Sequence, residues 1–406
     1  MEKNFRSCGA IRGPRFAVSS THRVDGHTLT LLHNGEEYFP HLVAAIDGAT
    51  HSVYLETYIY AADARGRVVS DALQRAAMRG VRVYLLLDGF GSADLPLSWV
   101  DELRAAGVEV LWFRPKISWL TLRRRRLRRL HRKLAVADGR IAFVGGINIA
   151  DDVPGGLITA PRLDYAVEVQ GDTAGHIHAS MRLLWMLESW MNFRRGGEHE
   201  KLQLAHTAGA PQNVSFLLRD NLRHRRDIER AYRKAIAGAQ REIIIANAYF
   251  LPGLRLRRAL LHAARRGVRV VLLLQGRVEY RLQHYATLAL YDQLLCAGVD
   301  IHEYHASFLH AKVAVVDGDW ATVGSSNIDP FSLWLGREAN LVVRDTGFAE
   351  SLRASLLQEM AQGAHPVTQS AWRKQGVLMR LLVRASYGLV RLLTGLIGDA
   401  RGRDNV

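Results

Sequence analysis

The chain contains the same pattern twice. "DALQRAAMRGVRVYLLLDG", which begins at Asp71, matches "RALLHAARRGVRVVLLLQG", which begins at Arg258. "AAGVEVLWFRP" from Ala105 matches "CAGVDIHEYHA" from Cys296. Each segment recurs about 180 to 190 residues later, a unit too long for a solenoid repeat. The 406 residues are therefore expected to fold as two copies of one domain.

Each copy alternates helices with strands. A helix that ends at Gly80 or Gly267 is followed by a continuous apolar strand, "VRVYLLLD" or "VRVVLLLQ", too apolar to leave one face in water. This alternation predicts an α/β fold. We expect two α/β/α sandwich halves related by a pseudo-twofold axis, with an active site at their interface. The expected boundaries are an N-terminal extension at 1–24, a first half at 25–195, a polar linker at 196–212, a second half at 213–365 and a basic amphipathic tail at 366–406.

One apolar strand in each copy carries a histidine and a lysine two positions apart. "RLHRKLAVADGRIAFVGGINIAD" contains His131 and Lys133, and "FLHAKVAVVDGDWATVGSSNID" contains His310 and Lys312. Side chains alternate between the faces of a strand, so the two cationic groups of each pair share one face. Such a pair is costly on a buried face unless it meets an anion. A phosphate group would satisfy both pairs.

The doubled phrase supplies further candidate residues. The catalytic candidates are His131, Lys133, Asp138, His310, Lys312 and Asp317. The two aspartates precede glycines and are also typical turn residues. The candidates for contact with the substrate phosphate are Asn148, Asn327 and Ser325. Gly146 replaces Ser325 in the first copy, so only one hydroxyl is expected there. Asp164 and Glu338 follow the two phrases at similar distances and are candidates to orient a histidine through Nδ1.

Two copies facing each other would place two histidines on opposite sides of one phosphate. One imidazole would attack phosphorus and form a phosphohistidine. The other would protonate the leaving oxygen and then take a proton from the incoming hydroxyl. A lysine beside a single histidine repels a divalent cation, and the phrase has no thiol or second carboxylate at ligand spacing. We therefore expect neither a metal nor a cofactor.

The doubled phrase resembles the signature of the phospholipase D superfamily, HxK(x)4D(x)6G(G/S) with a nearby Asn. The resemblance extends from Asp25 to Thr346, and segments such as "LLHNGEEYFPHLVAAI", "REIIIANAYFLPG" and "WATVGSSNIDPFSL" look most like bacterial cardiolipin synthases of the short type without N-terminal transmembrane helices. It implies transfer of the phosphatidyl group of one phosphatidylglycerol to the hydroxyl of another, with release of glycerol. It also implies His131 as the nucleophile and His310 as the acid and base.

The composition agrees with a polyanionic partner. The chain has 54 Lys and Arg against 39 Asp and Glu, a net charge of +15, which favours nucleic acid, anionic lipid or phosphorylated substrates. Cys8 and Cys296 do not form a disulfide framework. The sequence contains no apolar run long enough for a transmembrane helix.

Two segments are suited to a lipid surface. The insertion "KISWLTLRRRRLRRLHRK" combines arginines with apolar residues and would contact anionic head groups; the alternative is a solvated basic loop. The segment from Trp372 to Gly398 predicts a helix with a basic stripe of Arg373, Arg380, Arg384 and Arg391 and a broad apolar face. It would lie on a membrane or pack on the protein itself. We expect phosphatidylglycerol and a membrane surface as partners, no nucleic acid, and a peripheral position at the cytoplasmic face of the cell membrane.

Three other functions remain open. A phospholipase D-type nuclease or phosphodiesterase would use the same histidine pair, and the positive charge suits nucleic acid, although nucleic acid requires no apolar anchor. A lipid hydrolase would use water in place of the lipid alcohol and produce phosphatidic acid. A non-catalytic membrane-binding protein is disfavoured because both copies retain His, Lys and Asn.

Overall fold

The computed structural model describes residues 19–114, 128–153, 160–191, 213–220, 224–329, 336–374 and 376–399. The expected linker at 196–212 and most of the basic insertion, residues 115–127, lie outside these ranges.

The first half is built on an eight-stranded sheet with the order β1-β2-β9-β8-β7-β3-β4-β5. Its elements are β1 (Ser20–Val24), β2 (His27–His33), α1 (Asn34–Gly48), β3 (Ser52–Thr57), α2 (Ala64–Met78), β4 (Arg82–Asp88), α3 (Leu97–Ala105), β5 (Glu109–Phe113), β6 (Arg129–Leu130), β7 (Lys133–Ala137), β8 (Ile141–Gly145), β9 (Tyr165–Gln170) and α5 (Asp172–Met191). Strands β3, β4 and β5 are parallel, and β7 joins them antiparallel to β3.

The second half repeats this plan with the path β10-β16-β15-β14-β11-β12-β13-β17. Its elements are β10 (Val214–Arg219), α6 (Asp227–Gly238), β11 (Glu242–Asn247), α7 (Leu254–Arg265), β12 (Arg269–Gln275), α8 (Arg281–Leu288), α9 (Tyr291–Cys296), β13 (Asp300–Tyr304), β14 (Lys312–Val316), β15 (Trp320–Gly324), β16 (Gly336–Arg344), α11 (Thr346–Gly363), β17 (Ala364–Pro366), α12 (Gln369–Arg373) and α13 (Val377–Asp399). Apart from β1 and β17 at the outer edges, the two sheets have the same strand order. This confirms the predicted duplicated α/β fold.

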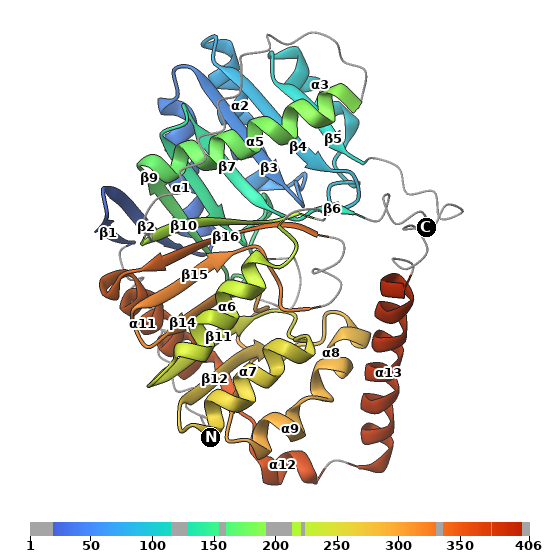
Figure 1. The fold of residues 1–406 in the computed structure, drawn as a ribbon. Helices are drawn as coiled ribbons and strands as arrows, with labels where there is room; N and C mark the ends of the chain where they lie inside the picture. Colours follow the sequence, from blue (N-terminus) through green and yellow to red (C-terminus); the bar gives the residue numbers. More distant parts are fainter. Residues whose placement is uncertain are drawn as a thin grey trace, which may run out of the picture.

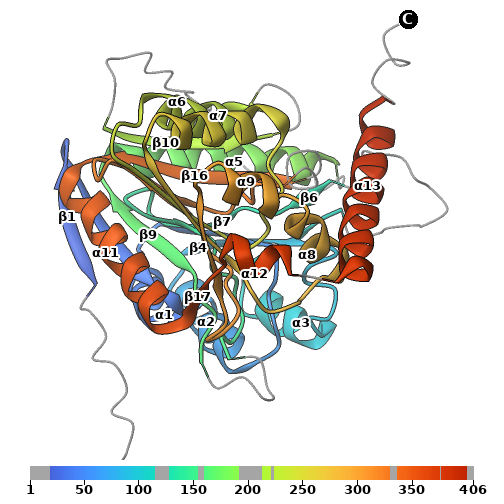
Figure 2. The ribbon, with the colours of Figure 1, turned by 90° about the horizontal axis from the view of Figure 1, so that it is seen from below.

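The two halves share one hydrophobic core. Residues from both sheets pack together with α5 and α11, among them Tyr165, Met181, Phe348 and Leu352, all fully buried. Separate clusters lie beneath α1 to α3 in the first half and beneath α6 to α9 in the second. Figures 1 and 2 show the halves stacked on each other, with α13 standing at one side of the second half. Each large apolar side chain buried between the halves contributes about 1.5–3 kcal/mol to their association.

The expected boundaries need two corrections. Strand β1 pairs with β2 along its whole length, although its residues fall in the expected extension at 1–24. We therefore propose that the first half begins at Ser20 and otherwise keep the boundaries given above. The tail is two helices, because α12 ends at Arg373 and α13 begins at Val377. Arg373 therefore does not belong to the basic stripe of the longer helix. Within the described part of the chain, no helix is long and apolar enough to cross a bilayer.

Asp138 and Asp317 occupy equivalent hairpin turns. Both adopt the left-handed backbone region, with φ of 51° and 53°. The Asp138 carboxylate accepts hydrogen bonds of 2.8 Å from the three backbone amides of residues 50–52. The Asp317 carboxylate accepts bonds of 2.8–2.9 Å from the amides of residues 240–242. Each aspartate thus fastens its hairpin to the start of β3 or β11.

This position corrects their grouping with the catalytic candidates. Asp138 follows β7 at its far end, about 16 Å along the strand from Lys133 at ~3.3 Å per residue. Asp317 likewise follows β14 at the end opposite Lys312. Aspartate readily adopts the left-handed turn conformation, and here three backbone amides donate to its carboxylate. These two features explain both aspartates as structural residues.

We expect Asp138→Asn to destabilise the fold in a pH-dependent way. Burial alone would raise the pKa of Asp138, but the amides of residues 50–52 lower it to about 2. The stabilisation is therefore complete above the unfolded pKa of about 3.9 and is lost as the pH falls toward 2. At pH 7 the variant should lose about 1–3 kcal/mol of unfolding free energy. Thermal unfolding at a series of pH values would measure this.

The control is Asp319→Asn, which removes the same charge from an exposed side chain two positions after Asp317. It should leave the unfolding midpoint almost unchanged. If the difference in unfolding free energy between the wild type and Asp138→Asn stays constant between pH 7 and pH 2, the explanation is contradicted.

Candidate active site

Each histidine follows a residue that is held by the end of a parallel strand. The Leu130 amide donates to Asp88 Oδ2 at 2.7 Å, and the Leu309 amide donates to Gln275 Oε1 at 3.3 Å. Asp88 ends β4 and Gln275 ends β12. The histidines therefore lie at the carboxyl edge of the parallel strands, where α/β sheets commonly place their ligands.

Backbone hydrogen bonds then connect each histidine to the opposite half. The His131 amide donates to the Arg337 carbonyl at 3.0 Å, and the His310 amide donates to the Leu163 carbonyl at 2.8 Å. Arg337 and Leu163 immediately precede the two carboxylates that the sequence singled out. The same short strand pairing thus occurs twice, once in each direction across the interface.

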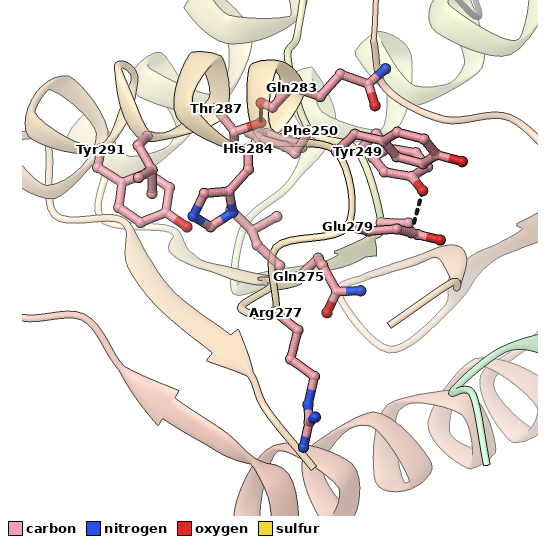
Figure 3. A pocket seen from close by; sticks show the side chains of 13 residues that line it. Tyr249, Phe250, Gln275, Arg277, Glu279, Gln283, His284, Thr287 and Tyr291 are labelled. Carbon is pink, nitrogen blue, oxygen red and sulfur yellow. Dashed lines mark hydrogen bonds between the residues drawn. The ribbon is translucent and has the colours of Figure 1, made fainter. Parts of the chain in front are cut away.

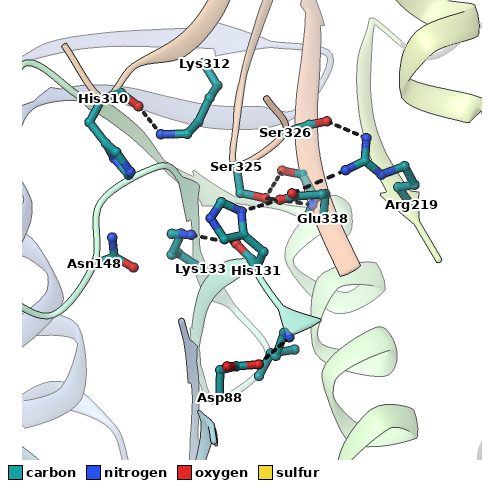
Figure 4. Close-up of polar contacts among 12 residues, drawn as sticks. Asp88, His131, Lys133, Asn148, Arg219, His310, Lys312, Ser325, Ser326 and Glu338 are labelled. Atoms are coloured by element: carbon teal, nitrogen blue, oxygen red, sulfur yellow. Dashed lines mark hydrogen bonds and ion pairs between the residues drawn. The ribbon is translucent and has the colours of Figure 1, made fainter. Parts of the chain in front are cut away.

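The carboxylates consequently orient histidines of the other half. His131 Nδ1 lies 3.0 Å from Glu338 Oε2, and His310 Nδ1 lies 2.5 Å from Asp164 Oδ2. Both carboxylates are buried. Figure 4 shows the His131 ring turned toward Glu338, with the His310 ring directed at the same region from the other side. Nδ1 of each ring is engaged in this contact, so Nε2 is the nitrogen left for a substrate.

The lysines complete a concentrated positive site. Lys133 and Lys312 are 4% and 0% exposed, and each ammonium donates to the carbonyl of the histidine two residues before it. Burial lowers the pKa of Lys133 to about 7 and that of Lys312 to about 8. Burial and both lysines also lower the pKa of His131 and of His310. Because each lysine lowers the pKa of both imidazoles, the two lysines and two histidines form one site, which an arriving phosphate would stabilise.

The two carboxylates have different surroundings. Arg219 Nη2 lies 3.3 Å from Glu338 Oε1, and both side chains are buried. Asn34 occupies the corresponding place in the first half, where its Oδ1 accepts from the Asp164 amide at 3.0 Å. Burial alone would raise the pKa of Glu338, but His131 and Arg219 lower it. Burial raises the pKa of Asp164 to about 6. The symmetric frame therefore holds two electrostatically unequal histidines.

Ser325 contacts a carboxylate, and its expected contact with the phosphate stays a prediction. Its buried hydroxyl donates to Glu338 Oε2 at 2.6 Å. A side chain at the equivalent Gly146 would overlap the Asp164 carboxylate. The glycine thus leaves room for the shorter acidic residue, and the serine fixes the longer one.

The two asparagines follow β8 and β15. Asn148 Oδ1 accepts from the Ile59 amide at 3.2 Å, which leaves its amide nitrogen available beside Lys133 (Figure 4). Asn327 is buried at the corresponding place of the second half. Their contact with a substrate phosphate stays a prediction.

Two residues of the site had no recognisable signal in the sequence. Arg219 ends an edge strand and belongs to no repeated phrase. Tyr58 lies with its ring 4.9 Å from the His131 ring and 5.3 Å from Lys133 Nζ, whereas the aligned position of the second copy is Ala248. Where the structure describes the chain, no group of three His, Cys, Asp or Glu side chains is placed to hold a metal ion.

Comparisons with known proteins agree on one family. The sequence matches the family described as "Cardiolipin synthase, PLD-like domain" over residues 42–153 and 232–360. Cardiolipin synthase B of Shigella flexneri is 41% identical over 355 residues, which cover 86% of this chain and 84% of that protein. Cardiolipin synthase B of Escherichia coli (strain K12) is 40% identical over the same shares. Cardiolipin synthase of Geobacillus sp. (strain WCH70) is 32% identical, covering 90% of this chain and 72% of that protein.

A solved structure shares the fold at low sequence identity. The crystal structure of phosphatidylserine synthase from Haemophilus influenzae Rd KW20 superposes with a TM-score of 0.67 at 14% identity, covering 90% of this chain and 94% of that one. The fold, the doubled His-Lys phrase and the close relatives together show that this chain belongs to the cardiolipin synthase family of the phospholipase D superfamily.

Proposed function

We propose that this protein transfers the phosphatidyl group of one phosphatidylglycerol to the free hydroxyl of another, giving cardiolipin and glycerol. The observation that carries the proposal is the reciprocal contact of His131 with Glu338 and of His310 with Asp164. It presents two oriented imidazoles, with two buried ammonium groups, to a single phosphodiester. Family membership supplies the lipid substrate class.

The reaction proceeds in two displacements. His131 Nε2 attacks phosphorus, the bond to the glycerol oxygen breaks, and His310 gives that oxygen a proton. The hydroxyl of a second phosphatidylglycerol then gives its proton to His310 as its oxygen attacks phosphorus, and the bond to His131 breaks. Lys133 and Lys312 stabilise the charge on the non-bridging oxygens. Every proton taken in one step is returned in the other.

The unequal carboxylates support this order. The nucleophile gains positive charge when it bonds to phosphorus, and Glu338 beside Arg219 is the carboxylate that stays ionised to balance it. The partner histidine must exchange a proton near neutral pH. Asp164, whose pKa burial raises to about 6, lies 2.5 Å from His310. Burial and both lysines lower the pKa of His310, so the negative charge of the bound phosphate must raise that pKa before the ring can carry the proton.

We also propose that α13 rests on the surface of an anionic membrane, which gives the protein a peripheral position there. Its buried residues Val383, Ser386 and Val390 form one stripe that packs toward α8. At about 100° per residue, three arginines lie beside this stripe and a wide apolar face lies beyond them. That face contains Leu378, Leu381, Leu382, Leu389 and Leu392, which are 42–82% exposed.

The helix was expected either to pack on the protein or to lie on a membrane, and its different faces suit these two roles. One narrow face is bound to the protein, and the exposed leucines next to a basic stripe are the arrangement that an anionic lipid interface accommodates.

His131→Ala and His310→Ala should both abolish cardiolipin formation from labelled phosphatidylglycerol vesicles in the presence of chelator. They should differ with phosphatidyl-p-nitrophenol, whose leaving group needs no protonation. His310→Ala should release about one nitrophenol per chain and then turn over at least ~100-fold more slowly than the wild type, because the base for the second step is missing. His131→Ala should give no burst. Stopped-flow absorbance measures both.

The reverse pattern, a burst in His131→Ala alone, would exchange the two roles. Cleavage of nucleic acid by the wild type with no lipid product would overturn the proposed function in favour of a nuclease.

Arg219→Met should move the acid limb of the kcat/KM profile to higher pH, by about one unit. Arg219 lowers the pKa of Glu338, so its removal raises that pKa, and the carboxylate is then neutralised earlier as the pH falls. The position of the limb on the pH axis does not depend on how much of the variant is folded. Arg219→Lys keeps the charge and should retain most of the wild-type profile. An acid limb that does not move in Arg219→Met would contradict this account.

Leu378→Glu combined with Leu381→Glu should weaken binding to vesicles that contain phosphatidylglycerol by at least about tenfold, since two apolar side chains leave the lipid. Vesicle flotation measures the bound fraction. Leu97→Glu combined with Met78→Glu places the same two charges on α3 and α2, at side chains that are 71% and 68% exposed, and should bind as the wild type does. Equal binding of all three proteins would exclude α13 as the contact surface.

A further inference from the structure

A pocket opens at the ends of β11 and β12. It contains about 370 Å³ of empty space, part of it continuous with solvent, and α8 forms one wall. Two of its lining residues are bonded to the segment that carries His310. The Ala248 amide donates to the Ala311 carbonyl at 3.1 Å, and the Gln275 amide group contacts both backbone groups of Leu309.

The polar groups of this pocket centre on Glu279. The Tyr249 hydroxyl donates to Glu279 Oε2 at 2.5 Å, the contact drawn in Figure 3. Arg162 Nη1 lies 3.9 Å from Glu279 Oε1, and the Glu279 side chain is 23% exposed. The charge of Glu279 partly offsets the lowering of the Lys312 pKa by burial, so it acts on the reaction site. The Tyr280 ring packs against Tyr249 at 5.7 Å and adds an apolar wall.

These groups favour a neutral polyol over other ligands. A carboxylate repels a second phosphate. An ammonium group would find the charge of Glu279 already balanced by Arg162, and the lysines of the reaction site would repel it. Hydroxyl groups can donate to the free lone pairs of Glu279 and to the Gln275 oxygen, while tyrosine faces pack against the C–H groups of a polyol.

We propose that this pocket binds the glycerol head group, first that of the departing glycerol and then that of the acceptor phosphatidylglycerol. The inference rests on the proposed function and specifies the side of the phosphate on which both alcohols lie. Both exchange a proton with His310 in the reaction described above, and the pocket is built against the residues that flank His310. Glu279 and Tyr249 are then specificity residues for a hydroxyl-rich acceptor.

A competition between alcohols tests the proposal. The full-length protein is given acyl-labelled phosphatidylglycerol with equal concentrations of deuterated glycerol, 1-propanol and ethanolamine, and the lipid products are separated by mass spectrometry. The wild type should incorporate glycerol in preference to 1-propanol. Glu279→Gln and Tyr249→Phe should each reduce the glycerol-to-propanol product ratio about tenfold, the effect of losing a charge-assisted hydrogen bond. The ratio does not depend on how much of a variant is folded.

The matched control is Tyr304→Phe. Tyr304 donates to Glu359 Oε2 at 2.9 Å, an equivalent tyrosine–glutamate pair outside the pocket, so this variant should keep the wild-type ratio. If Glu279→Gln forms no product, Tyr249→Phe decides the test.

Three outcomes would overturn the pocket assignment alone. They are a wild type without preference for glycerol, ratios that do not change in the variants, and variants in which ethanolamine transfer falls while glycerol transfer persists. A wild type that forms no phosphatidyl product from any of these alcohols would instead overturn the proposed function.

Discussion

Two backbone hydrogen bonds that cross between the halves hold the active site together. The His131 amide bonds to Arg337 and the His310 amide bonds to Leu163. Each bond places a histidine beside the carboxylate that follows its partner, so neither imidazole is oriented within its own half. The shared core of both sheets with α5 and α11 keeps these short contacts in register. Packing between the halves is therefore a condition of the chemistry as well as of stability.

Within this symmetric frame, the differences between the copies form a consistent set. The first half combines Asp164 with Gly146 and a neutral Asn34. The second combines Glu338 with Ser325 and a charged Arg219. Each carboxylate length fits the neighbour at the equivalent glycine or serine position. The buried Arg219 guanidinium lies 3.3 Å from Glu338, and the buried Lys312 ammonium lies 3.9 Å from Asp164. The result is one carboxylate held ionised and another whose pKa lies near 6.

The sequence predicts the duplication, the α/β class and the doubled His-Lys strands, because apolar periodicity and repeated phrases are local properties. It also identifies Asp164 and Glu338 as candidates, although it contains nothing that says which histidine each one serves. That choice depends on how the two sheets stack. The contact of Ser325 with Glu338 was not predicted, because a hydroxyl beside a phosphate site and a hydroxyl beside a carboxylate have the same sequence pattern. Arg219 was missed because its partner lies on the adjacent strand, far away along the chain.

The crossing contacts also bear on how such a chain could arise. A single ancestral copy would have had an open apolar face and a histidine without its carboxylate, so it could have worked only as a homodimer of identical subunits. In a homodimer any substitution appears twice, so the carboxylates and neighbours that surround the two imidazoles cannot diverge. Joining the copies into one polypeptide removes that restriction, and the Gly146 and Ser325 pair records the divergence that gene fusion permits.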